Sequence, residues 1–162
     1  MKNRMVKMVT APALALGMLA LGACDDPTTV EEHLEAAGFV VMVDGTEALR
    51  HMDTDGGTPA LGLTAGVVYD VEVALLDEDG TELVADHSAG ETHEDELGLT
   101  LLDTSVATWT PEAHTGTTEP EHVAAHGVLE TLTAGSSTVE LCLQHEGHCD
   151  YETVFTLDVT AP

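Results

Sequence analysis

Four histidines near the end of the sequence have the spacing of metal ligands. They are His122, His126, His145 and His148. The first two are four residues apart, which places both rings on one face of either a strand or a helix. The other two flank a turn at Gly147, so both rings can point into one space. Neutral imidazole suits Zn²⁺ and Cu²⁺, and Glu146, Cys149 or Asp150 could add a further ligand.

A β-hairpin is the element that would bring the two histidine pairs together. The apolar runs Val128–Leu132 and Val139–Leu143 flank Gly135-Ser136. Glycine is what a two-residue type II′ turn needs at its first central position, because φ is positive there. Such a turn would pair the two runs so that most of their apolar side chains share one face. One pair fits badly, because Glu130 would lie opposite Leu141.

The same register, when extended, places His126 opposite His145 and His122 opposite Cys149. The four imidazoles would then lie at one end of one hairpin, and we expect them to hold Zn²⁺ or Cu²⁺ there. The alternative is that nine histidines in an acidic protein are ordinary solvated side chains. In that case the domain is ligand-free and acts through structural or protein contacts.

The first residues have the pattern of an export signal. Lys2, Arg4 and Lys7 precede an apolar run, Met8–Leu21, which is too short to span a bilayer comfortably. The run ends in Leu-Gly-Ala-Cys24, which resembles a bacterial lipobox. The resemblance implies that Cys24 is acylated and becomes the mature N-terminus. The alternative is an ordinary signal peptide cut before a free Cys24.

This resemblance divides the chain into a lipoprotein signal peptide (1–23), an acidic tether (24–33) and one domain (34–162). Two or three acyl chains on Cys24 would hold the protein stably on a membrane. We therefore expect an extracytoplasmic, lipid-anchored protein on the periplasmic face of a bacterial membrane. Asp25, in the position after the cysteine, implies inner-membrane retention by resemblance to enterobacterial lipoproteins; elsewhere that rule need not apply.

The charge of the chain restricts its partners. Three of the four basic residues lie in the export signal, so Arg50 alone stands against 30 acidic residues. This balance argues against nucleic acid or anionic lipid as the main partner. The acids are spread along the whole chain, which favours a solvated surface, as in proteins from salty habitats, over a cation-collecting one. A hydrophobic content of 43% argues against disorder.

Cys142 and Cys149 remain if Cys24 is acylated. In an oxidising compartment such a pair usually forms a disulfide. The hairpin register complicates this expectation, since it puts Cys142 opposite Leu129. A bulge or a wider turn near Gly147 would restore it. Metal ligation and free thiols remain alternatives.

The rest of the chain predicts an all-β fold. About nine short strands follow one another at sandwich-like spacing, with turn signals between them. Besides the two runs of the hairpin, the expected strands are Phe39–Val43, Thr46–Met52, Leu61–Thr64, Val67–Leu76, Thr81–Ala85, Leu97–Leu102, Ser105–Trp109 and Tyr151–Val159. Asp44-Gly45 is a hairpin turn signal.

The last 60 or so residues resemble a bacterial immunoglobulin-like domain of group 2 type. The resemblance rests on Asp103-Thr-Ser-Val-Ala-Thr-Trp109, on Gly127-Val-Leu and on Ala134-Gly-Ser-Ser-Thr-Val-Glu-Leu141. It implies an immunoglobulin-like β-sandwich, which by itself implies no chemistry.

Signals for catalysis are weak. The serines lack a G-x-S-x-G setting, and H-E-x-x-H is absent. The segment from His51 to Gly56 resembles the opening of a calcium loop but lacks an acid at its far end, so a capped polar turn is the better interpretation. We therefore predict no enzymatic activity.

Overall fold

The computed structural model describes residues 35–85, 96–112, 121–145 and 147–162. The expected signal peptide, the tether and Cys24 lie outside these residues. The described chain is built from strands, with one short 3-10 helix at Asp53–Asp55. The strands are β1 (Gly38–Val43), β2 (Thr46–Met52), β3 (Ala60–Thr64), β4 (Val68–Leu76), β5 (Val84–Ala85), β6 (Glu96–Leu101), β7 (Ala107–Pro111), β8 (Glu121–His122), β9 (Ala124–Thr131), β10 (Gly135–His145) and β11 (His148–Thr160).

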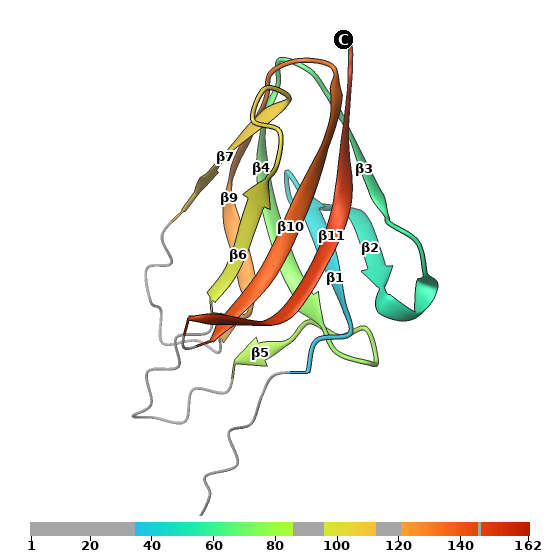
Figure 1. The fold of residues 1–162 in the computed structure, drawn as a ribbon, viewed down its shortest axis with the longest axis vertical. Coiled ribbons are helices and arrows are strands. Elements are labelled where there is room, and N and C mark those ends of the chain that lie inside the picture. The colour runs from blue at the N-terminus through green and yellow to red at the C-terminus, as the bar shows by residue number, and fades with distance from the viewer. Residues whose placement is uncertain (1–34, 86–95, 113–120, 146) are drawn as a thin grey trace, which may run out of the picture. The chain divides into compact units, whose positions relative to one another are not determined.

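Two sheets face each other, as Figure 1 shows. One has the order β2-β1-β4-β9-β7, and the other has the order β3-β11-β10-β6. Strands β5 and β8 form a separate two-stranded ribbon. The neighbours β4-β9-β7 and β6-β10-β11 correspond to the B-E-D and C-F-G strands of an immunoglobulin fold. The predicted all-β, immunoglobulin-like sandwich is confirmed, with eleven described strands where about nine were expected.

The core lies between the sheets and follows from alternating side chains. In β11, Phe155, Leu157 and Val159 are buried, while the residues between them are more exposed. This is the two-residue period of a strand with one covered face. Phe39 packs against Phe155 from the opposite sheet, with ring centroids 5.6 Å apart. Aliphatic side chains supply most of the remaining core.

The β1–β2 hairpin forms where the sequence predicts it. Asp44 and Gly45 have φ values of 50° and 73°, which is the pair of positive angles that a type I′ turn requires. The register then shifts between Val41 and Met42. Val41 pairs with Leu49 and Met42 with Glu47, so Ala48 is the extra residue of a β-bulge.

The predicted hairpin around Gly135-Ser136 is wrong. Its first run lies in β9, except for Leu132, and its second lies in β10, and these strands belong to opposite sheets. Residues 132–134 make the crossing. Gly135 and Ser136 are strand residues that pair with Val159 and Asp158 of β11. The true hairpin partner of β10 is therefore the following strand.

The error has a physical cause. Alternation requires only that each strand have one apolar face. Two consecutive strands can bury their apolar faces in two ways. In a hairpin both faces lie on the same side of one sheet, and after a crossing the two strands lie in opposite sheets with their apolar faces toward each other. The ill-fitting pair was the sign that favoured the crossing: Glu130 is exposed, while Leu141 is fully buried.

Candidate functional site

The four candidate histidines lie on three different strand pairs. His122 pairs with Val84 in the β5–β8 ribbon, and His126 lies in β9 opposite Glu72. His145 and His148 are direct partners at the end of the β10–β11 hairpin. The register that would have gathered all four is absent. The side chains of His122 and His145 lie outside the described residues, so metal binding by these residues stays a prediction.

His126 is held on the outer face of the five-stranded sheet. Its neighbours in the strand, Ala125 and Gly127, are buried, so the His126 side chain points away from the core. The Nε2 atom lies 2.9 Å from an oxygen of Asp70, and Nδ1 lies 3.4 Å from an oxygen of Glu112. The ring thus bridges β4 and the residue that follows β7, and both of its nitrogens face carboxylates. Within the described chain, no group of three or more His, Cys, Asp or Glu side chains has the arrangement of a metal site.

The end of the β10–β11 hairpin carries a disulfide between Cys142 and Cys149, whose Cα atoms are 5.6 Å apart. The two cysteines are not direct partners, because Cys142 pairs with Glu152 and Cys149 with Gln144. A register shift between Leu143 and Gln144 brings them within reach. A bulge near this turn was one of the two arrangements expected from the sequence to bring the cysteines together; the other was a wider turn.

Residues 51–55 form a capped polar turn, as the sequence favoured over a calcium loop. The carboxylate of Asp55 accepts the backbone N–H of Met52 at 3.0 Å. Asp53 accepts the hydroxyl of Tyr151 at 3.0 Å and so ties the turn to β11. Burial, followed by the hydrogen bond to Asp53, raises the pKa of Tyr151 well above its usual range.

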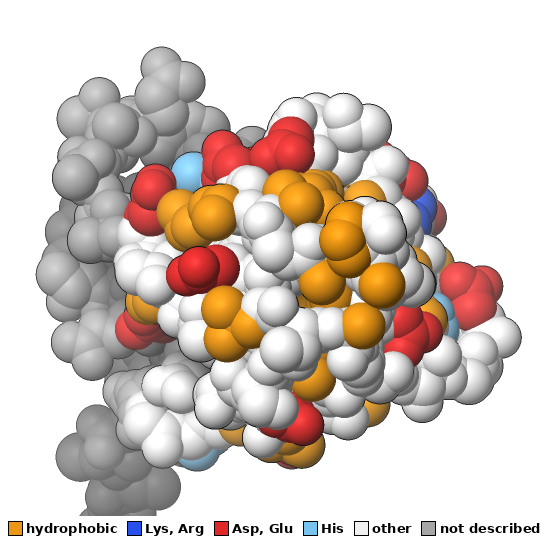
Figure 2. All heavy atoms as spheres, turned by 90° about the horizontal axis from the view of Figure 1, so that it is seen from above, with side chains coloured by type: hydrophobic (Ala, Val, Ile, Leu, Met, Phe, Trp, Pro, Cys, Tyr) orange, Lys and Arg blue, Asp and Glu red, His pale blue; other side chains and the backbone are white. Residues whose placement is uncertain are grey.

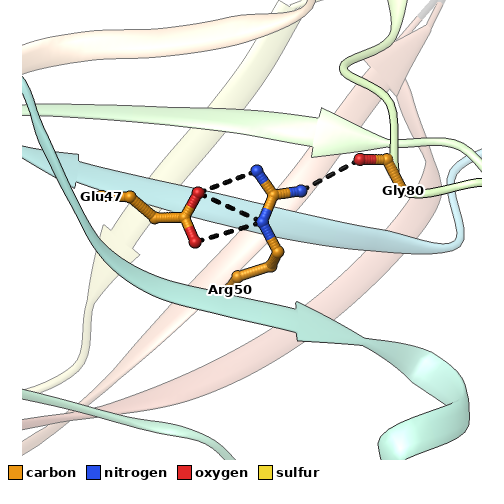
Figure 3. Close-up of polar contacts among 3 residues, drawn as sticks. All are labelled: Glu47, Arg50 and Gly80. Carbon is orange, nitrogen blue, oxygen red and sulfur yellow. Dashed lines mark hydrogen bonds and ion pairs between the residues drawn. The ribbon is translucent and has the colours of Figure 1, made fainter.

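Arg50 makes an ion pair that the sequence analysis did not predict. Its guanidinium donates to both carboxylate oxygens of Glu47, the nearest at 2.9 Å, and to the backbone oxygen of Gly80 at 3.0 Å (Figure 3). Residues three apart on a regular strand point to opposite faces. The bulge at Ala48 puts Glu47 and Arg50 on the same face. The ion pair could not be predicted from the spacing of the two residues, because it depends on this bulge. The hydrogen bond from Arg50 is the main reason that the pKa of Glu47 is lowered.

One end of the sandwich exposes apolar side chains. This surface, called here the apical end, comprises the connections 65–67, 102–106 and 132–134 with the first residue of β4. Backbone hydrogen bonds join these connections: Gly66 to Thr131 at 2.9 Å and Leu132 to Val106 at 2.8 Å. Figure 1 shows all three at the end where the described chain finishes.

Four of the five exposed large hydrophobic side chains of the described residues lie at the apical end. They are Val68 (60% exposed), Leu102 (59%), Leu132 (41%) and Val67 (38%). The fifth, Val84, lies in β5 at the other end of the sandwich. Single exposed hydrophobic residues are normal, but a group of them at one place is typical of a contact surface.

Comparison with known proteins adds little. No family model matches the chain, and no curated protein matches it. The solved domains 4 and 5 of the S-layer protein SbsC align with 78% of this chain at 15% identity and a TM-score of 0.41. This chain spans about half (54%) of that structure.

Longer structures of the same S-layer protein give similar values. Domains 1–6 have a TM-score of 0.41 at 15% identity, covering 79% of this chain and 14% of the other. Domains 4–9 have a TM-score of 0.41 at 16% identity, covering 75% and 14%. Similarities of this size identify neither a family nor a function.

Proposed function

We propose that this protein is a lipid-anchored extracytoplasmic domain that acts by binding another protein. The single observation that supports binding is the group of exposed apolar side chains at the apical end. The anchor rests on the sequence Leu-Gly-Ala-Cys24. Among the described residues, no helix has the length and apolar character needed to cross a bilayer.

The start of β1 supports the orientation in which the apical end faces a partner. The chain enters the sandwich at Gly38, at the end opposite the apical connections (Figure 1). A short tether from Cys24 would therefore keep the entry end near the membrane and the apical end away from it. No catalytic step is part of the proposal, in keeping with the weak sequence signals for catalysis.

The anchor is tested by replacing Cys24 in the full chain. In cells supplied with radiolabelled palmitate, we expect the wild-type chain to incorporate label and to fractionate with membranes. Cys24→Ser should lose the label. An unlabelled wild-type chain would contradict the lipobox interpretation.

Binding is tested by placing a photo-crosslinking amino acid at position 132 or at position 84 of the full chain in cells. The two positions are matched, because Leu132 is 41% exposed and Val84 is 39% exposed. We expect one discrete adduct from position 132 and none of that size from position 84. No adduct from position 132, or the same adducts from both positions, would contradict the proposal.

A second candidate function is transition-metal binding at the end of the β10–β11 hairpin. The observation that favours it is the direct pairing of His145 with His148, which places two potential imidazole ligands on neighbouring strands. Titration calorimetry of the full chain in detergent, without a His tag, tests it with Zn²⁺ and with Cu²⁺. Binding should disappear in His145→Ala/His148→Ala and persist in His126→Ala. No binding by the wild-type chain would exclude the idea.

A further inference from the structure

Three carboxylate side chains lie near the apolar side chains of the apical end. Glu130 is exposed and lies directly opposite Val68 in the β4–β9 pairing. Asp103 is exposed and follows Leu102. Asp158 lies on β11 opposite Ser136, next to the connection 132–134. Figure 2 looks down on this end and shows apolar side chains over the middle of the view, with acidic side chains among and around them.

The charge at Asp103 is fixed by local hydrogen bonds. Its Oδ1 atom accepts the hydroxyl of Ser105 at 2.6 Å and the backbone N–H of Ser105 at 2.9 Å. The hydrogen bond from the Ser105 hydroxyl has the larger effect and the one from the backbone N–H the smaller, and both lower the pKa of the Asp103 carboxyl. The carboxylate therefore stays ionised throughout the ordinary pH range.

Among the residues that the structure describes, no lysine or arginine lies beside these carboxylates. Arg50 is the one basic residue of the sequence beyond the first seven residues. Its guanidinium is hydrogen-bonded to Glu47 and to the backbone oxygen of Gly80. Gly80 lies in the turn that follows β4, whereas the apical end contains the first residue of β4. Among the described residues, the apical end thus combines exposed apolar side chains with three carboxylates and without lysine or arginine.

We infer that the apical end docks a protein whose contact surface has apolar side chains framed by lysine or arginine. This inference rests on the proposed function and names the chemistry of its partner. A second copy of this chain does not fit, because it would present carboxylates to carboxylates, and like charges across an interface disfavour association. An anionic partner is disfavoured for the same reason. A cationic frame would pair with Asp103, Glu130 and Asp158 while its apolar centre covered Leu102 and Leu132.

The inference is tested with the photo-crosslink from position 132, using variants of equal net charge. The apical variant is Asp103→Asn/Glu130→Gln/Asp158→Asn. The control variant, Glu78→Gln/Asp79→Asn/Glu152→Gln, removes the same number of charges from exposed positions outside the apical end. We expect the apical variant to lower the adduct yield at least about fivefold and the control to leave it within about twofold, because charges near a contact control association most strongly.

The apolar centre is tested in the same way. Leu102→Ser should lower the adduct yield from position 132, while Val84→Ser should not. Circular dichroism of each purified variant shows whether it remains folded, and an unfolded variant is replaced by the corresponding single substitution. Peptide mapping of the adduct should find lysine or arginine flanking the crosslinked residue of the partner.

The outcomes separate the two proposals. An adduct whose yield is equal in the apical and control variants, or whose partner surface is acidic, overturns the charge inference and leaves protein binding standing. An adduct between two copies of this chain also overturns it. Failure to form any specific adduct overturns both.

Discussion

Thr131 is a buried polar side chain that joins three backbone groups. Its hydroxyl can donate to the carbonyl of Thr64 at 2.7 Å or of Val67 at 2.8 Å, and it accepts the N–H of Val67 at 3.1 Å. Only 1% of the residue is exposed. The residue thus fixes the connection between β3 and β4 against the end of β9, and so helps to build the apical end.

Thr131→Val keeps the shape of this side chain but removes its hydrogen bonds. We expect the free energy of unfolding to fall by about 1–3 kcal/mol, because the N–H of Val67 is left unsatisfied in a partly buried place. Urea denaturation measures the change. The matched control is Thr133→Val, since the hydroxyl of Thr133 donates to Ser105 in an exposed place. An equal loss in the two variants would contradict the role of burial.

Tyr151 should make stability fall at alkaline pH. Its pKa is raised in the folded chain, so the folded chain keeps a phenol proton that the unfolded chain loses near pH ~10. The stabilisation is therefore complete below that pH and is lost as the pH rises further. Urea denaturation between neutral pH and about pH 11 should show a steeper decline for the wild type than for Tyr151→Phe. Parallel declines would refute this explanation.

Strands β7 and β9 approach each other closely at Gly127, which explains why glycine stands there. A Cβ atom built at this position would lie 2.5 Å from the carbonyl oxygen of Thr110 and 2.8 Å from the ring of Trp109. The glycine of the Gly-Val-Leu motif is therefore needed for the packing of Trp109 on the core.

Gly127→Ala should lower the free energy of unfolding by about 1–3 kcal/mol, since two backbone segments would have to separate. Gly62→Ala is the control, because a Cβ atom at that position of β3 meets nothing within 4 Å. Denaturant midpoints of both variants provide the test, and tryptophan fluorescence reports any displacement of Trp109. If Gly127→Ala left the free energy of unfolding unchanged, strand β7 would be able to move away from β9 without loss of stability.

The β10–β11 hairpin is the longest strand pairing of the fold, and the disulfide lies near its turn. The cysteines are seven residues apart, so reduction frees only a short loop. Chain-entropy reasoning then gives a loss of about 2 kcal/mol. Thermal unfolding with and without dithiothreitol should show a lower melting temperature for the reduced wild type. Cys142→Ala/Cys149→Ala should not respond to the reductant, and an equal response would refute the assignment.

At the scale of the whole molecule, self-repulsion is the dominant electrostatic feature. The formal net charge is −26 at pH 7, and three of the four basic residues that could offset it lie within the first seven residues. Such a charge opposes the compact state and disfavours association between copies.

Added salt should therefore stabilise the protein. Raising NaCl from about 0.1 M to about 1 M shortens the screening length from about 10 Å to about 3 Å. We expect a higher urea midpoint at the higher salt, with potassium chloride giving the same result because the effect is not ion-specific. No change, or a decrease, would mean that local ion pairs such as Glu47–Arg50 outweigh the general repulsion.

The sequence by itself determined the local elements. Alternating side chains predicted β4 and β11, and Asp44-Gly45 predicted the first hairpin, because both signals depend only on neighbouring residues. The β-sandwich class also followed, since the number and spacing of strands restrict the layers that can bury them. The immunoglobulin-like type was implied by the resemblance of the last 60 or so residues. The predicted ends of these strands lie within four residues of the observed ends.

Only the tertiary structure decided which strands pair. Strands β9 and β10 are adjacent in the sequence and alternate alike, yet they lie in opposite sheets. This pairing separates His126 from the β10–β11 hairpin. In the first hairpin, a one-residue bulge brings Glu47 and Arg50 onto the same face. The apical surface likewise arises from three connections that are distant in sequence. Strand pairing depends on which apolar strand faces pack together in the core. That packing involves strands from the whole chain, so neighbouring residues do not determine it.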